Sequence, residues 1–283
     1  MEEIKANSLN ELRKVISDFR KVVASYDIPI VSGKPCIERG DILFRGQENA
    51  SWKLETTLER ASPDKFYVRG YVHRALRGIH QIESFSGHRW QIDRSKIDAE
   101  FADNHEFRIN LPGYSYLVYL RHSSFPSPLL DWSESPYVAT FFAYESARGK
   151  DDLALYCYAE RPRGTKGGWS GEALIDVQGP FVTTHKRHFS QRAWYSVAGR
   201  WDENRKDHYF VTHEEVFQRN QPDQDVLLKI RMPSSIRKQV LEELGDYNIN
   251  YFTLFHSEDA LIKSIAMTTF DSSDDSHGRT GGR

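Results

Sequence analysis

The chain has 283 residues, of which 39% are hydrophobic and 13% aromatic, so it can bury one large core or two small ones. Its 38 Lys and Arg residues nearly balance 40 Asp and Glu residues, which argues against a globally basic nucleic-acid-binding protein. Two cysteines are too few for a disulfide framework, and neither a signal-peptide core nor a membrane-length apolar run is visible, so we expect a cytoplasmic protein outside the membrane.

Residues 1–40 are expected to form a helix followed by a loop. Ser8 and Glu11 have the spacing of a capping box, and apolar residues then recur at helical spacing to about Tyr26. Two prolines and two glycines within residues 28–40 indicate the loop.

The next segment, residues 41–47, reads DILFRGQ and predicts a short buried strand that ends in Arg45 and Gly46. A charge at the end of a buried strand needs an anionic partner. That partner is either Asp131, in a structural ion pair, or a phosphate or carboxylate of a ligand, which a guanidinium binds through two parallel hydrogen bonds.

Helical spacing predicts a second amphipathic helix at residues 67–85 and a short helix at residues 114–120, just before His122. The polar stretch between them, residues 87–110, is expected to be a peripheral insertion that covers one edge.

Residues 121–158 have the strongest pattern, because they combine a short extended piece, a turn, a helix and a strand. Pro126 and Pro128 exclude a helix there, so residues 129–131 are expected to be extended. Ser135 is a good N-cap for a helix that Gly149 ends, and the apolar residues 153–158 predict a buried strand.

Polar and aromatic side chains crowd the start of that helix, namely Asp131, Trp132 and Ser133. A helix N-terminus can bind a phosphate through its free N–H groups. The alternative is structural: Asp131 and Ser133 cap the helix and Trp132 packs in the core.

The rest of the chain predicts further strands and helices. Residues 161–171 are expected to be a flexible surface loop and residues 201–208 a polar insertion. Strands are predicted at residues 174–177, 193–197, 226–230 and 251–255, helices through 240–244 and 260–266, and a disordered tail at 271–283. Because helices and strands do not alternate regularly, we predict an α+β domain with a mixed or antiparallel core and peripheral helices.

The histidines do not predict a metal site, since the pairs His185 and His188, and His208 and His213, lack acidic or cysteine neighbours. Arg187 precedes Gln191 by four residues, which places the two side by side on a helix or tight turn. The Gln191 amide could hydrogen-bond a sugar hydroxyl, or it could be structural.

Four segments in this order carry a resemblance to the FRG domain family. Residues 44–47 (FRGQ) resemble the motif that names the domain, and residues 122–143, with LLDW and S-P-x-x-A-x-x-F-F-A, resemble its second hallmark. Residues 187–195 and 253–261 are similar to two later motifs. The chain departs from the family pattern at five positions: Ser124, Ala193 and Ala260 replace glycines, Pro128 an arginine and His256 a proline.

The motif order resembles that of the ADP-ribosyltransferase fold, which implies split sheets and a domain of residues 41–270 after an N-terminal segment of residues 1–40. The resemblance implies that Arg45 lies on the first strand, Asp131 and Ser133 at the helix mouth, and Gln191 in the third position. These four residues are the expected catalytic group. The residues expected to contact the nucleotide are Arg45, Gln47, His122, Trp132 and Arg187.

The implied function is an NAD-dependent ADP-ribosyltransferase-like enzyme that modifies a protein or nucleic-acid acceptor or hydrolyses NAD, with NAD as substrate and no metal. Because Gln191 carries no charge, Asp131, Glu258 or Asp259 must stabilise the oxocarbenium-like state. The alternative is a non-catalytic module that binds a nucleotide or a partner in a bacterial defence or toxin system. A third possibility is nucleic-acid binding through the basic and aromatic residues 186–205.

Overall fold

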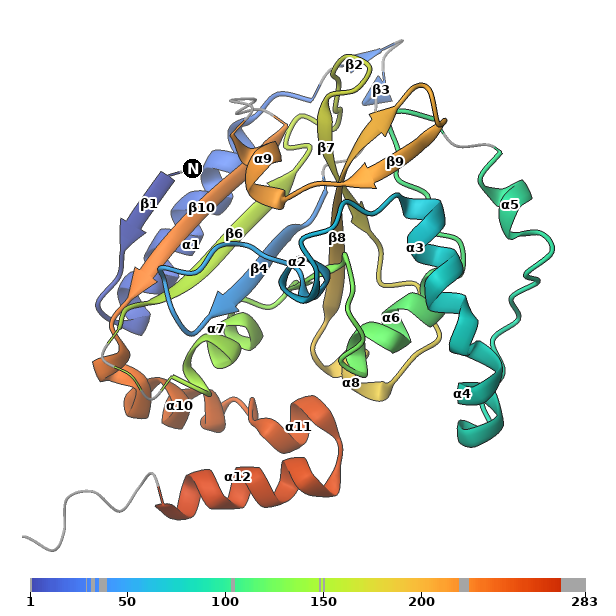
Figure 1. Cartoon of the computed structure of the whole chain (residues 1–283). Coiled ribbons are helices and arrows are strands. Elements are labelled where there is room, and N and C mark those ends of the chain that lie inside the picture. The colour runs from blue at the N-terminus through green and yellow to red at the C-terminus, as the bar shows by residue number, and fades with distance from the viewer. Residues whose placement is uncertain are drawn as a thin grey trace, which may run out of the picture.

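The computed structural model describes residues 2–28, 30–31, 34–35, 40–102, 105–147, 149, 151–218 and 224–270. One eight-stranded sheet runs through these residues (Figure 1). Its spatial order is β1 (Glu2–Lys5), β10 (Asp225–Met232), β6 (Leu153–Glu160), β4 (Ile42–Gln47), β5 (Leu130–Ser133), β8 (Ala193–Asp202) and β7 (Ala173–Gln178), and β9 (Asp207–Phe210) also pairs with β8. Only β1 and β10 are parallel in this described sheet, so the predicted α+β class with a mixed sheet is confirmed.

The sheet consists of two halves that meet at a single residue pair. β4 is registered with β6 over six residue pairs, whereas β4 and β5 are registered only at Phe44 and Ser133. The strands β1, β10, β6 and β4 form one half, and β5, β8, β7 and β9 form the other. Beyond Phe44 and Ser133 the two halves diverge, which leaves room for a cavity at their junction.

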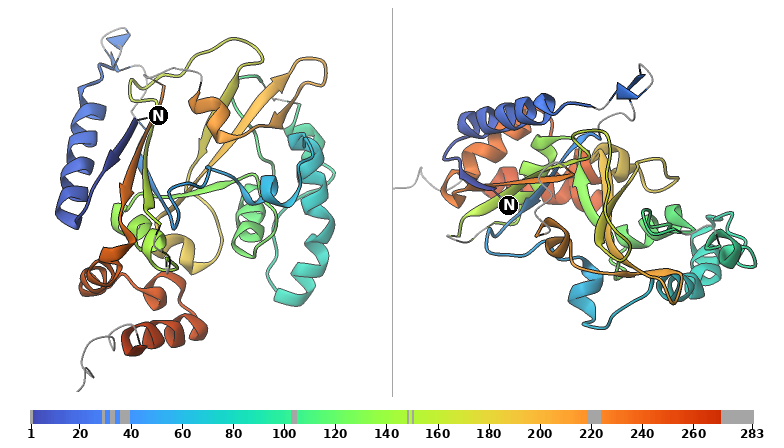
Figure 2. Two further views of the ribbon diagram at one scale, coloured as in Figure 1. Left: turned by 60° about the vertical axis from the view of Figure 1, so that its left-hand side comes forward. Right: turned by 90° about the horizontal axis from the view of Figure 1, so that it is seen from above.

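Helices cover both halves, with α1 and the group α3 to α6 on opposite sides of the molecule (Figure 2). The first half packs with α1 (Leu9–Ser25), α7 (Pro136–Tyr144), α10 (Arg237–Asp246), α11 (Tyr251–Phe255) and α12 (Glu258–Phe270). The second half packs with α3 (Val68–Ala75), the 3-10 helix η1 (Leu76–Gly78), α4 (Ile79–Ser86), α5 (Ile97–Glu100) and α6 (Tyr114–His122). Shorter elements are α2 (Thr57–Ala61), α8 (Lys186–Ser190), α9 (His213–Phe217), η2 (Ser234–Ile236), β2 (Ile30–Val31) and β3 (Lys34–Pro35).

Several predicted helix starts and strands are confirmed. The Ser8 hydroxyl caps α1 by accepting from the Glu11 N–H, although the Glu11 carboxylate accepts from the N–H of Asn7 rather than closing the box on Ser8. Ser135 caps α7 by accepting from the Val138 N–H, with Pro136 in the first turn. Every residue of β6 is buried, as expected of a central strand.

Three element predictions are wrong. The helix α7 ends at Tyr144, with Glu145 as its C-cap, rather than at Gly149. Residues 251–255 form the helix α11 rather than a strand, because Asn250 and Thr253 make a reciprocal capping box and the Tyr251 and Phe255 rings stack one turn apart. A run of five apolar residues has no periodicity that separates the two states. Residues 201–208 are not an insertion: they close the β8–β9 hairpin, in which Trp201 is opposite His208.

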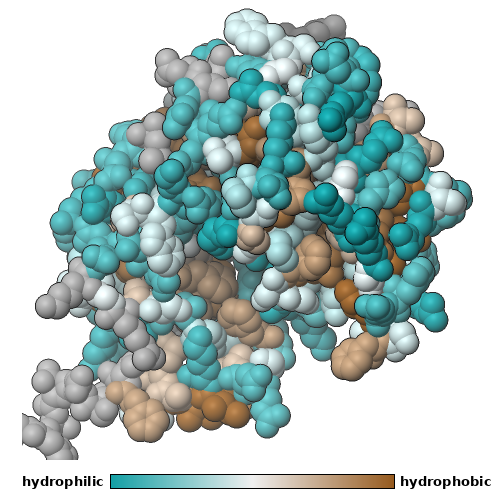
Figure 3. Space-filling view, viewed as in Figure 1, coloured by the Kyte–Doolittle hydropathy of each residue, from teal (hydrophilic) through white to brown (hydrophobic). Residues whose placement is uncertain are grey.

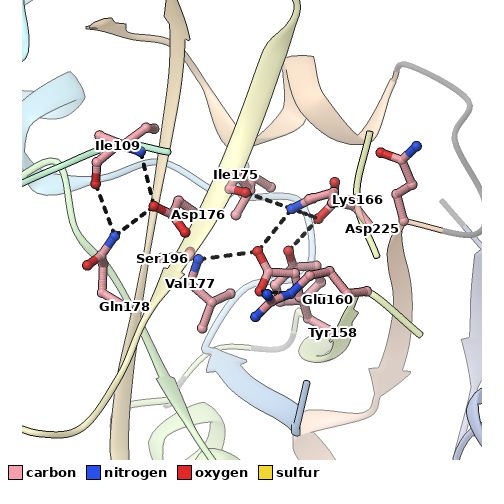
Figure 4. A network of polar contacts seen from close by, with 12 residues as sticks. Ile109, Tyr158, Glu160, Lys166, Ile175, Asp176, Val177, Gln178, Ser196 and Asp225 are labelled. Atoms are coloured by element: carbon pink, nitrogen blue, oxygen red, sulfur yellow. Dashed lines mark hydrogen bonds and ion pairs between the residues drawn. The ribbon is translucent and has the colours of Figure 1, made fainter. Parts of the chain in front are cut away.

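The predicted flexible loop at residues 161–171 is anchored by Lys166, whose side chain is 17% exposed. Its ammonium group lies 3.0 Å from a Glu160 carboxylate oxygen, 2.7 Å from Asp225 and 2.6 Å from the main-chain oxygen of Ile175 (Figure 4). The Tyr158 hydroxyl also donates to Asp225, at 2.5 Å. An ion-paired lysine in the interior holds this Gly-rich segment against the sheet.

The segment before residue 40 packs on the same sheet, because β1 pairs with β10 and α1 shares a core with α7 and β6. The boundary at residue 40 stays a prediction, and the predicted tail, like Cys36, lies outside the described residues. In the described part of the chain, no helix combines the length and the apolar character that crossing a bilayer requires.

Candidate functional site

A cavity of about 800 Å³ lies where the two halves of the sheet diverge. Residues from β4, β5, α6, α7, α8 and α11 line it, and the space-filling view shows a hollow in this face (Figure 3). The structure brings all of the sequence-predicted site residues to this one cavity: Arg45, Gln47, His122, Asp131, Trp132, Ser133, Arg187 and Gln191.

The sequence of β4 explains why one face of this strand lines the cavity while the other face packs against the helix α7. Phe44 is buried in the core with α1 and α7. Gly46 faces the same way, and a Cβ there would lie 2.0 Å from the main-chain oxygen of Ala139 in α7. Only glycine lets the α7 backbone lie this close to the strand. Successive strand residues point to opposite faces, so Arg45 and Gln47 are directed to the cavity.

Arg45 bridges the gap between the halves. Its Nη1 donates to the main-chain oxygen of Asp131 at 2.8 Å, whereas its Nε is buried and has no hydrogen-bond partner among the described residues. Burial lowers the pKa of Arg45 to about 10, so the guanidinium is still cationic at neutral pH.

The Asp131 carboxylate pairs with Arg121, the last-turn arginine of α6. The ion pair hypothesised between Arg45 and Asp131 is therefore not formed, because Arg45 contacts the main chain of that residue instead. Arg121 was missed by sequence reasoning, although its position beside His122 is the signal that points to it.

Arg187 is the third arginine at this wall. It donates to the main-chain oxygen of His122, and burial lowers its pKa. Arg45, Arg121 and Arg187 each have a buried Nε without a hydrogen-bond partner in the described part of the chain. Of these three guanidinium groups only that of Arg121 is paired with a carboxylate among the described residues, so the wall retains positive charge and unused donors.

Ser133, Trp132 and Gln191 make hydrogen bonds within the fold. The Ser133 hydroxyl donates to the main-chain oxygen of Gln191 at 2.7 Å and accepts from the Ser135 N–H at 3.0 Å. Trp132 is 3% exposed, and its indole N–H donates to the Ser196 hydroxyl at 2.7 Å. The Gln191 amide donates to the main-chain oxygen of Leu254 at 3.2 Å. Trp132 is therefore packed in the core, which is the structural alternative that the sequence offered for it.

Gln47 has an unused acceptor at the cavity. Its side chain is buried, and its Nε2 donates to the main-chain oxygen of Lys53 at 3.0 Å. Its Oε1 is also buried and has no partner among the described residues. A buried acceptor without a partner is costly, so this side chain is held beside the cavity at the expense of one hydrogen bond.

Sequence reasoning also missed several residues that line the cavity. Trp52 is 51% exposed, which leaves an aromatic surface for stacking. The other charged lining residues are Glu48, Lys53, Glu55, Arg60 and Glu145. Glu258 and Asp259, the acids considered from the sequence, belong to α12 and do not line this cavity.

No group of three or more His, Cys, Asp or Glu residues in the described ranges could hold a metal ion. The histidines considered from the sequence have other contacts: the His208 ring lies 3.3 Å from the main-chain oxygen of Glu106, and the His213 ring 2.8 Å from the Ser196 hydroxyl. The aromatic residues Tyr195 and Trp201 of the proposed nucleic-acid segment are buried in the sheet, so they are not available to stack on bases.

Residues 40–152 match the family model of the FRG domain. The matched FRG segment includes Arg45, His122 and Asp131, whereas Arg187 and Gln191 lie beyond it. No curated protein and no solved structure matches the chain.

Two departures from the FRG pattern fall at unusual backbone conformations. Ser124, where the pattern has glycine, has φ 64°, a left-handed conformation that favours glycine. His256, where the pattern has proline, has φ 51°, which proline cannot adopt. The His256 ring lies 2.5 Å from the Ser190 hydroxyl, so this departure joins α11 to α8 beside the cavity.

Proposed function

We propose that the cavity binds NAD or a related nucleotide, and that the chain is an ADP-ribosyltransferase-like enzyme that acts on a macromolecular acceptor or on water. The observation that carries the proposal is that Arg45, Arg121 and Arg187 line one cavity, where only Arg121 is paired with a carboxylate and the other two donate to main-chain oxygens. Guanidinium groups bind phosphate through paired hydrogen bonds.

A diphosphate would satisfy the arginines that the fold leaves short of acceptors. The Nη2 of Arg45 and the Nη1 of both Arg121 and Arg187 have no hydrogen-bond partner among the described residues and are not enclosed, so a phosphate in the cavity can accept from them. The cavity volume of about 800 Å³ is within the range of small-molecule and cofactor sites. Trp52 offers an aromatic surface for a base.

The proposed reaction breaks the bond between nicotinamide and ribose through an oxocarbenium-like state. A negative group near the ribose stabilises that state. Asp131 is neutralised by Arg121, so the cavity acids Glu48 and Glu55, which have no ion pair among the described residues, are the candidates for this role.

The second candidate function is a non-catalytic nucleotide-binding FRG module. It is favoured by the contacts of three expected catalytic residues: the Ser133 hydroxyl and the Gln191 amide hydrogen-bond within the fold, and the Asp131 carboxylate is paired. Such a module would retain the cavity wall formed by Arg45, Arg121 and Arg187, the arginine wall, and would lose only turnover.

The test combines binding with turnover. Calorimetry measures the affinity for ADP-ribose, and adenine-labelled NAD reports transfer or hydrolysis with and without cell extract. Arg45→Lys keeps the charge but loses the planar fork, so affinity should fall roughly tenfold or more. Arg192→Lys is the matched control, because Arg192 pairs with Glu134 at the surface and does not line the cavity.

The outcomes separate the candidates. Turnover by the wild type that Arg45→Lys abolishes supports the enzyme. Binding without turnover supports the non-catalytic module. If the wild type binds neither ADP-ribose nor NAD, the nucleotide proposal is rejected. If the wild type and both variants bind equally well, the assignment of the site to this cavity and to Arg45 is rejected.

A further inference from the structure

An unbroken chain of hydrogen bonds runs from the core to the cavity wall. The His188 Nε2 lies 3.0 Å from the main-chain oxygen of Pro180, and its Nδ1 lies 3.0 Å from the Tyr195 hydroxyl. That hydroxyl lies 2.8 Å from the Nε2 of His122, which lines the cavity. This series of hydrogen bonds therefore joins α8, β8 and α6.

The direction of each bond follows from the Pro180 end. A carbonyl oxygen can only accept, so the Nε2 of His188 carries the hydrogen. Burial lowers the pKa of His188, so the ring is neutral and its Nδ1 is an acceptor. The Tyr195 hydroxyl, whose pKa is raised by burial, stays protonated and must donate to that Nδ1.

The remaining bond sets the tautomer of His122. The Tyr195 oxygen has used its hydrogen on His188, so it accepts from the Nε2–H of His122. The Nδ1 of His122 then has a free lone pair. This atom is not enclosed, and it has no hydrogen-bond partner in the described part of the chain.

We propose that the Nδ1 of His122 is a fixed hydrogen-bond acceptor for a ribose hydroxyl of the bound nucleotide, and that Tyr195 and His188 are positioning residues that hold its tautomer. The proposal rests on the proposed function, since the arginine wall places the diphosphate of the ligand in the same cavity as His122. A tautomer held by the fold cannot switch to a donor, so the site selects for a ligand group that donates.

The groups around His122 keep the ring neutral. Burial is the largest cause that lowers its pKa, to about 3, and nearby positive groups lower it further, whereas Asp131 on β5 opposes the shift. The other charged or titratable groups facing it are Arg187, His185 and His188, with Tyr195 from β8. The ring is thus an acceptor across the physiological pH range.

The test reads the tautomer directly. Long-range proton–nitrogen spectra of the full chain, labelled with ¹⁵N and assigned with a His122→Asn variant, distinguish a protonated Nε2 from a protonated Nδ1. We expect the Nε2–H form of His122 in the wild type. Tyr195→Phe should release the ring into a mixture of tautomers. Tyr114→Phe is the matched control, because this half-buried tyrosine donates its hydroxyl hydrogen to the Gly179 oxygen, and its ring packs against Tyr195 without taking part in these hydrogen bonds.

Titration with ADP-ribose tests the ligand contact. The Nδ1 resonance of His122 should shift on saturation, and His122→Phe, which removes the acceptor, should weaken binding by about fivefold to tenfold, the effect of one hydrogen bond, while Tyr114→Phe stays within about twofold. An Nδ1–H tautomer in the wild type, which needs no variant to fold, would overturn the positioning role.

An unchanged Nδ1 resonance in the saturated complex would overturn the acceptor role. If the wild type does not bind ADP-ribose, the proposed function and the ligand contact both fall, and the spectra of the free protein still decide whether Tyr195 and His188 hold the tautomer.

Discussion

Arg45 donates a 2.8 Å hydrogen bond to the main-chain oxygen of Asp131, across the point at which β4 and β5 separate. An arginine side chain here occupies the gap in the sheet that ladder hydrogen bonds would otherwise close. The Asp131 carboxylate stays free to pair with Arg121. One residue thus links two arginines by two different groups, which places both at the cavity.

This geometry predicts the outcome of two double-mutant cycles. Arg121→Met and Asp131→Asn should be non-additive in unfolding free energy by roughly 1–3 kcal/mol, because they remove the two sides of one partly buried ion pair. Arg45→Met with Asp131→Asn should show weaker coupling, because the main-chain acceptor of Arg45 survives the substitution and only the Coulombic attraction of the Asp131 carboxylate is lost. Urea denaturation measures both cycles, and equal coupling energies would contradict the assignment.

Gly46→Ala should be severely destabilising, by about 3 kcal/mol or more, since the new Cβ would lie 2.0 Å from the Ala139 oxygen and 2.6 Å from the Ala143 nitrogen. Gly70→Ala in α3 is the control: no atom lies within 4 Å of its Cβ, so helix propensity predicts a gain of about 0.5–1 kcal/mol. Thermal melts compare the two. A Gly46→Ala variant as stable as the wild type would show that α7 does not lie on β4 this closely.

Lys166→Met should destabilise the fold by about 3 kcal/mol, because Glu160 and Asp225 would lose the buried cation that they share, while Glu160 keeps its ion pair with Arg161 at 3.2 Å. Lys206→Met removes an exposed lysine that pairs with Glu203 three residues away, so its effect should stay below about 1 kcal/mol. Chemical denaturation of both variants tests this contrast. Equal effects would mean that the 161–171 loop is not anchored through Lys166.

Asp176 predicts a pH dependence of stability. Burial raises its pKa to about 6, with the nearby Glu160 adding to the shift, from about 3.9 in an unfolded chain. A raised carboxyl pKa is unfavourable for folding once the unfolded form has ionised, so the penalty grows from about pH 4 to 6 and is constant above.

Asp176→Asn removes that ionisation and retains an acceptor for the Ile109 N–H. Its stability relative to the wild type should therefore increase by roughly 1–2 kcal/mol between pH 5 and pH 8. Urea titrations at several pH values measure this difference. A constant difference across the range would show that Asp176 is not perturbed.

Ser124→Gly should stabilise the protein by about 0.5–1 kcal/mol, because Ser124 has a positive φ of 64° that glycine adopts without strain. Ser123, its neighbour, has φ −101°, so Ser123→Gly should be neutral or destabilising. Thermal melts of the Ser124→Gly and Ser123→Gly variants, compared with the wild type, measure both effects. A loss of stability in Ser124→Gly would mean that its hydroxyl matters more than its backbone.

The local sequence pattern by itself determined those helices and strands that have strong hydrophobic periodicity or clear capping residues. Ser8 and Ser135 marked the starts of α1 and α7, and the apolar runs predicted β4 and β6. It also singled out Arg45, because a charge at the end of a buried strand needs a partner. These signals are local, so they are visible without the fold.

Only the tertiary structure decided which groups meet. The partner of Asp131 is Arg121 rather than Arg45, and His122 reaches Tyr195 from 73 residues away in the chain. The helix at residues 251–255 depends on a cap whose sequence signal is weak beside a five-residue apolar run. Distances between strands and the directions of hydrogen bonds depend on how the two halves of the sheet separate, and that separation is a property of the packed fold rather than of any segment.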